Sequence, residues 1–127
     1  MKETRLNEAN KTIGRPVTLK KNKEFAFVYR KGAGKASKVL VCICAKSRRS
    51  GVRVGFVVSK KIGNSVTRNL VRRRMKEAYR SLCAEISGDY GIIFVARSGI
   101  EDSDYKRILH DMRFLLRKQN LLPKEEQ

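Results

Sequence analysis

Apolar residues recur along the chain with two different periods, one typical of helices and the other typical of strands. The first helical period links Phe25, Val28 and Tyr29, which are spaced i, i+3 and i+4. Asn22 can cap the start of this helix, and Gly32 favours its end. The folded part of the chain is therefore predicted to open with a short amphipathic helix.

Runs rich in β-branched residues predict strands over residues 38–45, 53–59 and 90–96. A polar loop over residues 47–51 predicts that the first two strands form a hairpin. The third strand follows a helix, which favours a parallel β-α-β unit inside a mixed sheet. Alternation separates the apolar residues of the first strand into two faces, with Val39, Val41 and Ile43 on one and Leu40, Cys42 and Cys44 on the other.

Two longer helices are predicted between and after these strands. One follows a Gly63-Asn64 turn and ends near Gly88. The other is predicted to start at Ser103, with Asp104 in its first turn. Apolar residues keep helical spacing through this last helix, at Tyr105, Ile108, Leu109, Met112, Leu115 and Leu116.

One side of the first long helix carries a run of like charges. Basic residues follow one another there at i+4 steps with no acid between them, at Arg68, Arg72, Lys76 and Arg80. This basic stripe would be ~18 Å long. Like-charged neighbours cost helix stability, so a polyanion that neutralises them is favoured over simple solvation of the charged side.

The whole chain shares this positive excess. Thirty Lys and Arg residues against twelve Asp and Glu give a net charge of +18 over 127 residues, which favours nucleic acid as the partner. The length suits one modest core, so we predict one domain at residues 17–120, between a flexible basic arm at 1–16 and a charged tail at 121–127. No apolar run is long enough to span a membrane and no signal peptide is evident, so a cytoplasmic location is expected.

No constellation of residues predicts catalysis by the protein itself. Cys42, Cys44 and Cys83 lack the paired spacing of a zinc site and are predicted to be reduced thiols packed as small apolar side chains. His110 is the only histidine, and it falls among the polar positions of the last helix, where solvation is expected. Acids at residues 101–104 cluster at a helix start, where the helix dipole alone favours them. We therefore predict no catalytic residue and no metal ligand in the protein.

The segment around the basic helix resembles a known family. Residues 54–77 (VGFVVSKKIGNSVTRNLVRRRMKE), with residues 19–25 upstream and 92–97 downstream, resemble the protein subunit of bacterial ribonuclease P. The resemblance covers about residues 19–118, and the SKKIGN turn before a basic helix is highly specific.

The resemblance implies a single α/β domain, an α+β sandwich in the order αβββαβα. Its mixed four-stranded sheet would contain a left-handed β-α-β crossover, against the usual right-handed rule. Periodicity alone indicates only two of the three N-terminal strands clearly. The third is expected near residues 45–47 or at the entry to residue 53.

In function, the resemblance implies the protein component of a ribonucleoprotein endoribonuclease. A catalytic RNA with bound Mg²⁺ removes the 5′ leader of precursor tRNA in that family, and the protein assists. The implied partners are the catalytic RNA, with one protein per RNA, and the leader. No cofactor would bind to the protein alone. A small basic ribosomal protein or an RNA chaperone is the alternative, and a stand-alone metal-dependent nuclease would need converging carboxylates.

Two RNA-binding surfaces follow from the resemblance. The surface facing the catalytic RNA would consist of Lys60, Lys61, Asn64, Arg68, Asn69, Arg72, Arg73, Lys76 and Arg80. A cleft between the first helix and the sheet would receive the leader on Phe25, Tyr29, Leu40 and Cys42, in the way that aromatic side chains stack on unpaired bases.

The sequence departs from the family pattern at two positions. Leu70 stands where an arginine is usual, so the contact with the catalytic RNA is expected to shift along the helix. Cys42 stands where an aromatic residue is common in relatives, and a thiol stacks poorly, so the leader contact from that strand is expected to be weaker.

Overall fold

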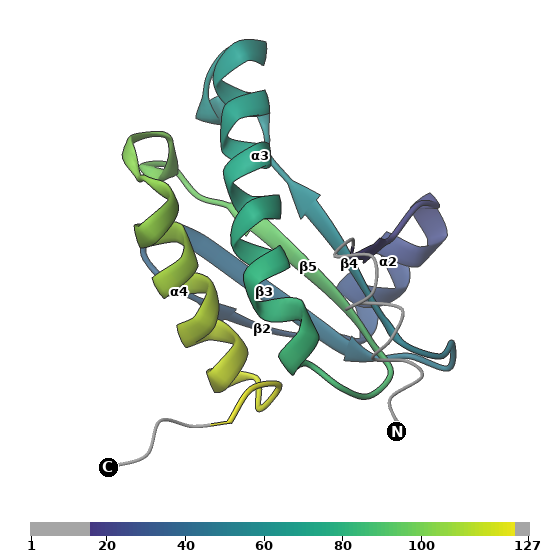
Figure 1. Ribbon diagram of the computed structural model, residues 1–127. Helices are drawn as coiled ribbons and strands as arrows, with labels where there is room; N and C mark the ends of the chain where they lie inside the picture. The colour runs from purple at the N-terminus through teal and green to yellow at the C-terminus, as the bar shows by residue number, and fades with distance from the viewer. Residues whose placement is uncertain (1–15, 124–127) are drawn as a thin grey trace.

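The computed structural model describes residues 16–123, which form a mixed five-stranded sheet with helices on both faces (Figure 1). In chain order the elements are β1 (Val17–Thr18), α2 (Asn22–Lys31), β2 (Ala33–Ala36), β3 (Leu40–Lys46), β4 (Val52–Val57), η1 (Lys60–Ile62), α3 (Ser65–Leu82), η2 (Cys83–Glu85), β5 (Tyr90–Ala96), η3 (Ile100–Asp102) and α4 (Tyr105–Lys118). The predicted α/β class and element order are confirmed, with the two-residue β1 as an extra edge strand. The predicted N-terminal arm lies outside the described residues, apart from Pro16.

β5 lies between β3 and β4 in the sheet, whose order is β1-β4-β5-β3-β2. Because β5 pairs antiparallel with β3 and parallel with β4, the predicted hairpin between the first two long strands is wrong. The polar loop instead passes the start of β5, where the Tyr90 amide donates to the Gly51 carbonyl at 3.2 Å. Periodicity shows that β5 is buried on both faces, but it does not show which strands pair with its edges.

The connection from β4 through α3 to β5 is left-handed. With α3 in front of the sheet, β4 and β5 both run upward and β5 lies to the left of β4 (Figure 1). A right-handed connection would place the second strand to the right. The crossover implied by the family resemblance is therefore present.

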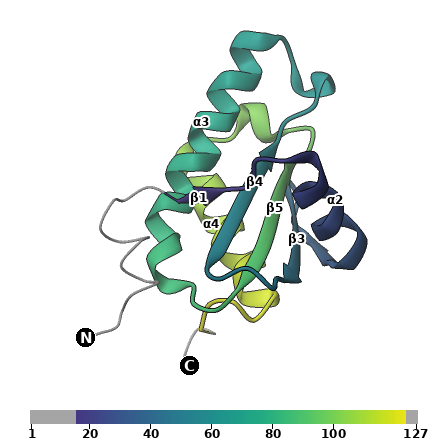
Figure 2. The ribbon, with the colours of Figure 1, turned by 90° about the vertical axis from the view of Figure 1, so that its right-hand side faces the viewer.

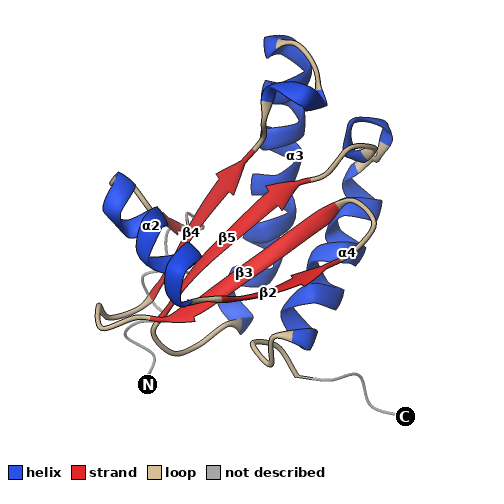
Figure 3. Cartoon of the chain, turned by 180° about the vertical axis from the view of Figure 1, so that it is seen from behind, coloured by secondary structure: helices blue, strands red, loops and turns tan. Residues whose placement is uncertain are grey.

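Two apolar layers hold the sheet to its helices. α3 and α4 cover one face, and α2 covers part of the other (Figures 2 and 3). The larger core lies under α3 and α4 and includes Met75 and Leu115, each completely buried. Burying a side chain of this size stabilises a fold by roughly 1.5–3 kcal/mol. The smaller core lies under α2, where Val28 packs with Ile93 of β5.

The face of β3 that was predicted to line the cleft beside α2 lies on the other side of the sheet. Leu40 and Cys42 are completely buried in the larger core, under α3 and α4. Ile43 packs on the α2 side instead. Alternation separated the two sets of residues correctly, but it could not show which face α2 covers, because both faces are apolar.

The third N-terminal strand is β2 (Ala33–Ala36), not the region near residues 45–47 or 53. All four of its residues are exposed and none is β-branched, so it has no hydrophobic period. Pairing with β3 holds it in place. Near it, Gln119 donates from Nε2 to the Ala33 carbonyl at 2.8 Å and to the Cys42 carbonyl at 2.9 Å, and so joins the end of α4 to this edge.

Element ends differ slightly from those predicted. Lys21, not Asn22, is the N-cap residue of α2, and the side chain of Glu24 accepts from the Lys21 amide at 3.0 Å. Asp104 caps α4, so that helix begins at Tyr105 instead of Ser103. Leu121 and Leu122 belong to the larger core, so the folded unit extends beyond the predicted boundary at residue 120. Within residues 16–123, no helix is long and apolar enough to cross a membrane.

Candidate nucleic-acid interface

The turn before α3 fixes the start of the basic helix. Asn64 is its N-cap residue, and the side-chain Oδ1 accepts from the Thr67 amide at 2.9 Å. Gly63 has φ 156°, and a Cβ atom there would lie 2.9 Å from Cγ2 of Thr67, so a larger residue would disturb the cap. η1 places Lys60 and Lys61 just ahead of this turn, both exposed. The SKKIGN segment thus presents two lysines beside the N-terminus of α3.

The basic stripe lies on the solvent side of α3. Arg68 and Arg72 are half-buried, whereas Lys76 and Arg80 are exposed, as are Asn69 and Arg73 beside them. Across residues 16–123, no cation of the stripe forms an ion pair with a carboxylate. The opposite side of the helix is buried through Val71, Met75, Ala78, Tyr79 and Leu82. The predicted separation into a core face and a basic face therefore holds.

Two arginines of the stripe are positioned by hydrogen bonds that leave their charge unpaired. The Arg68 side chain donates from Nε to the Gly63 carbonyl at 3.1 Å. Arg72 donates from a terminal nitrogen to Oδ1 of Asn69 at 3.0 Å. These contacts restrict the side chains without neutralising them, so a phosphate would meet partly ordered cations.

Arg74, on the same helix but outside the basic stripe, has a different environment. Its side chain donates to the Ser103 carbonyl at 2.9 Å, and so ties α3 to the turn before α4. Arg74 is not one of the residues spaced at i+4 steps in the basic stripe. Its position on the helix instead directs its side chain toward α4.

α2 presents apolar side chains next to the other face of the sheet. Phe25, Val57 and Val95 are half-buried and pack against the smaller core, and Tyr29 is 48% exposed one helical turn beyond Phe25. We call Phe25, Tyr29, Ile43, Val57 and Val95 the α2 apolar surface. Phe25 and Tyr29 were predicted for this surface, while the sheet residues were missed. The alternation in β3 places Ile43 on the face opposite Leu40 and Cys42. It would therefore have identified Ile43 if the face covered by α2 had been known.

A small pocket joins the α2 apolar surface to the basic stripe. It has a volume of about 220 Å³ and lies at the β1–β4 edge of the sheet. Phe25 lines it from α2, Phe56 from β4, and Arg72 and Lys76 from α3. We call it the edge pocket. Two aromatic side chains and two cations therefore line one pocket, an arrangement that suits one base and its phosphate.

Leu40 and Cys42 cannot belong to this surface. Both lie on the opposite face of β3, completely buried under α3 and α4. Burial also raises the pKa of the Cys42 thiol, so it stays protonated as a small apolar group. The prediction that these two residues line a cleft beside α2 is wrong. The expected weakening of the leader contact at Cys42 loses its basis as well.

The other cysteines have similar surroundings. Cys83 is buried and Cys44 is half-buried, and all three thiols are free. Burial raises the pKa of Cys44 to about 11, and burial is also the main cause of a raised pKa at Cys83. These protonated thiols have the packing role that the spacing predicted.

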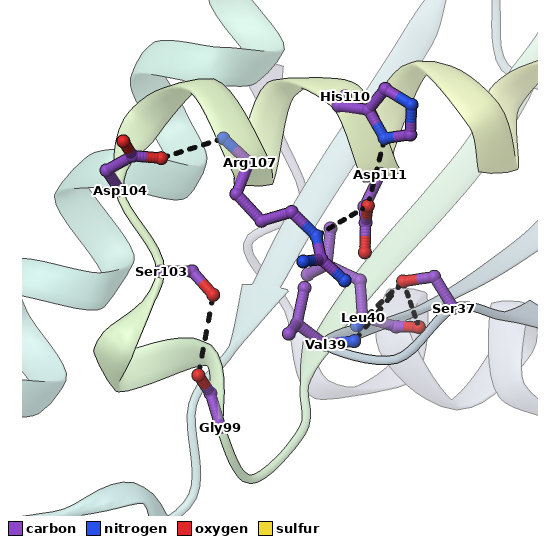
Figure 4. Close-up of polar contacts among 9 residues, drawn as sticks. All are labelled: Ser37, Val39, Leu40, Gly99, Ser103, Asp104, Arg107, His110 and Asp111. Atoms are coloured by element: carbon purple, nitrogen blue, oxygen red, sulfur yellow. Dashed lines mark hydrogen bonds and ion pairs between the residues drawn. The ribbon is translucent and has the colours of Figure 1, made fainter.

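The acids near the start of α4 stabilise the local backbone (Figure 4). Asp104 accepts from the Arg107 amide at 3.0 Å as the N-cap, and Glu101 accepts from the Gly99 amide at 3.0 Å. Asp111 accepts from Nε of Arg107 at 3.0 Å and contacts Nδ1 of His110 at 3.2 Å. The imidazole of His110 remains largely exposed. Among residues 16–123, no three potential ligands converge as a metal site.

Comparison with known proteins gives one consistent family. A family model described as Ribonuclease P matches residues 13–120. The ribonuclease P protein component of Alkaliphilus metalliredigens is 42% identical over 104 residues, which are 82% of this chain and 94% of that protein. The corresponding Clostridium botulinum protein is 44% identical over 101 residues, 79% of this chain and 91% of the relative.

Solved structures share the fold. The Staphylococcus aureus RNase P protein superposes with a TM-score of 0.77 at 27% identity, over 86% of this chain and 100% of that one. The Thermotoga maritima RNase P protein gives a TM-score of 0.72 at 21% identity, over 80% of this chain and 96% of that one. The second likeness supports the fold alone.

Proposed function

Because the chain belongs to the bacterial ribonuclease P protein family, we propose that it binds the catalytic RNA and the 5′ leader of precursor tRNA as a single protein subunit. The chain is thereby a component of tRNA 5′-end processing. Bond cleavage is assigned to the RNA and its bound Mg²⁺, as the family resemblance implies. The protein contributes binding, orientation and positive charge, and we expect it to act in the cytoplasm.

The observation that carries this assignment is the edge pocket. Phe25 contributes an aromatic ring there, while Arg72 and Lys76 supply the cations within the same 220 Å³ space. Single-stranded RNA is held by such a combination, because bases stack on aromatic rings and cations follow the phosphates. Stacking tolerates many sequences, which suits a leader that differs between precursors. We infer that the leader passes from the α2 apolar surface to the stripe through this pocket.

The rest of the stripe is assigned to the catalytic RNA. Lys60 and Lys61 extend it past the Gly63 turn, and Arg80 lies near its other end. Asn64 contributes mainly by capping α3, since its side-chain oxygen is already engaged by Thr67. Neutralised phosphates repel one another less, so the holoenzyme should need less Mg²⁺ than the RNA alone.

Reconstitution tests this function directly. Precursor tRNA, a bacterial ribonuclease P RNA and this protein are combined, and each is omitted in turn. We expect no cleavage by the protein alone, slow cleavage by the RNA at low Mg²⁺, and faster cleavage when both are present. Cleavage by RNA-free protein would contradict the assignment of catalysis to the RNA. Equal rates with and without the protein at every Mg²⁺ concentration would contradict its assisting role.

A further inference from the structure

A larger basic pocket lies on the other flank of α2. It has a volume of about 670 Å³ and is bounded by α2, the loop between β3 and β4, and the start of β5. Its cations are Lys21, Lys23, Arg30, Arg48, Arg49 and Arg53, against one carboxylate, that of Glu24. We call it the flank pocket. Its volume is within the range of small-ligand sites, roughly 300–1,000 Å³.

The flank pocket is separate from the α2 apolar surface. Phe25 and Tyr29 lie one turn apart on one side of α2, whereas Phe27 lies about 200° around the helix from Phe25 at ~100° per residue. The flank pocket is lined by Phe27 and does not include Phe25 or Tyr29. The two pockets share Leu19, but a molecule bound in the flank pocket would leave Phe25, Arg72 and Lys76 of the edge pocket open.

The single carboxylate of the pocket is already satisfied. Glu24 accepts from the backbone amides of Lys20 and Lys21 at 2.7 and 3.0 Å, and its other oxygen pairs with Arg49. These two backbone hydrogen bonds are the main causes that lower the pKa of Glu24. Arg48 makes no ion pair within residues 16–123, and Arg53 donates only to the Ser50 carbonyl, at 3.2 Å. Uncompensated positive charge thus remains at the rim.

The floor of the pocket is apolar and includes a stacking surface. Leu19 and Val28 lie at its base, and Gly91 of β5 allows α2 to approach so closely that a Cβ atom there would lie 2.7 Å from Cγ2 of Val28. The Arg30 guanidinium lies over the Phe27 ring at 5.9 Å from its centroid. Bases stack readily on aromatic rings and on guanidinium planes. The pocket combines this platform with cations for a phosphate.

We propose that the flank pocket holds an unpaired nucleotide of an RNA strand, as a second single-stranded RNA site beyond the edge pocket. The base would lie against Phe27 and Arg30, and Arg48 and Arg53 would contact the phosphates on either side. The excess of cations favours RNA over a protein partner, because Glu24 is the one carboxylate among the described residues that line the pocket. The strand is a leader segment or a single-stranded part of the catalytic RNA, and the experiment distinguishes these sources.

The test compares the salt dependence of RNA binding between matched variants of the full chain. Arg48→Ala with Arg53→Ala should reduce the slope of log affinity against log salt by about 1.4 for single-stranded RNA, since each lost phosphate contact accounts for about 0.7. Lys106→Ala with Lys118→Ala removes the same charge from exposed sites on α4 and should leave the slope unchanged. Equal slopes for the two double variants would overturn the proposal. Adenosine monophosphate, titrated alone, shows whether a free nucleotide suffices.

A crosslinking experiment leaves every cation in place. Ala26 is exposed and lines the flank pocket, so Ala26→Cys can carry a thiol-linked photo-crosslinker, with His110→Cys on α4 and the unaltered chain as controls. In the reconstituted holoenzyme, crosslinks from position 26 to unpaired nucleotides support the proposal. Their place in the leader or in the catalytic RNA identifies the source. Crosslinks no more frequent than from position 110 would overturn it, even if the edge pocket binds the leader as proposed.

Discussion

The ring of Phe25 occupies the space that any side chain at Gly55 would need. A Cβ atom at position 55 would lie 2.5 Å from Cε1 of Phe25 and 3.2 Å from Cδ1 of Leu19. β4 and α2 approach so closely because residue 55 has no side chain. The edge pocket owes its shape to this contact, since both residues line it.

Gly55→Ala should therefore push the Phe25 ring out of place. Overpacking of this kind costs about 1–3 kcal/mol of folding stability. We expect weaker binding of leader RNA and a smaller effect on binding to the catalytic RNA, measured with precursor tRNAs of different leader lengths. Gly34→Ala is the control, because its Cβ would lie 3.8 Å from the nearest side-chain atom, in ordinary contact. Identical leader affinities for both variants would contradict the role of Phe25.

Arg73→Ala with Arg80→Ala should weaken holoenzyme assembly without unfolding the protein. Both side chains lie off the buried side of α3, and neither forms an ion pair among the described residues. The slope of log affinity against log salt should fall by roughly 1.4–1.8, because each phosphate contact contributes about 0.7–0.9. Lys106→Ala with Lys118→Ala provides the charge-matched control. An unchanged slope would mean that the stripe is only a solvated surface.

Most of the fold could be predicted because its helices and long strands carry strong periods. The apolar arc of α3 and the spacing of α4 located both helices to within a few residues. β2 was missed because its exposed residues have no period, and its position depends on pairing with β3. β5 lies between β3 and β4 because of pairing between strands that are distant in sequence, and local sequence patterns do not predict such pairing.

The candidate site was predictable to a similar extent. The stripe on α3 followed from charge and spacing alone, and its exposure agrees with that prediction. Leu40 and Cys42 were placed wrongly because both faces of β3 are apolar, so alternation separates them without saying which helix covers each. The flank pocket was not predicted. Its cations come from segments that are distant in sequence, namely α2 with its N-cap residue, the loop after β3, and β4.

Position 43 can test the corrected orientation of β3. Ile43→Tyr should add a stacking surface on the α2 side, where Ile43 is only half-buried. One added base–aromatic stack contributes about 1–3 kcal/mol, so leader affinity should rise roughly five- to a hundredfold. Affinity for mature tRNA should not change. A folded Ile43→Tyr variant with unaltered leader affinity would exclude this residue from the leader path.

Cys42→Tyr should give the opposite outcome. Cys42 is completely buried under α3 and α4, so a tyrosine there would overpack the larger core at a cost of about 1–3 kcal/mol or more. We expect a lower melting temperature and no gain in leader affinity. Cys42→Ala is the size control and should be far milder. A stable Cys42→Tyr protein that binds the leader more tightly would contradict the buried position of this residue.

Asp111 should make folding stability depend on pH in the acid range. Burial alone would raise its pKa, but the contacts of its carboxylate with His110 and Arg107 outweigh burial and lower the pKa below the usual value. A carboxylate with a lowered pKa in the folded state contributes stability that is fully present above the unfolded pKa, about 3.9, and is lost as pH falls through the folded pKa. Asp111→Asn should therefore be less stable than the unaltered protein near neutral pH. The difference should shrink below about pH 4.

Urea unfolding from pH 7 to pH 2 measures this difference in stability, with the exposed Asp102→Asn as control. Parallel pH profiles for the unaltered chain and Asp111→Asn would show that the interactions of Asp111 do not stabilise its charged form.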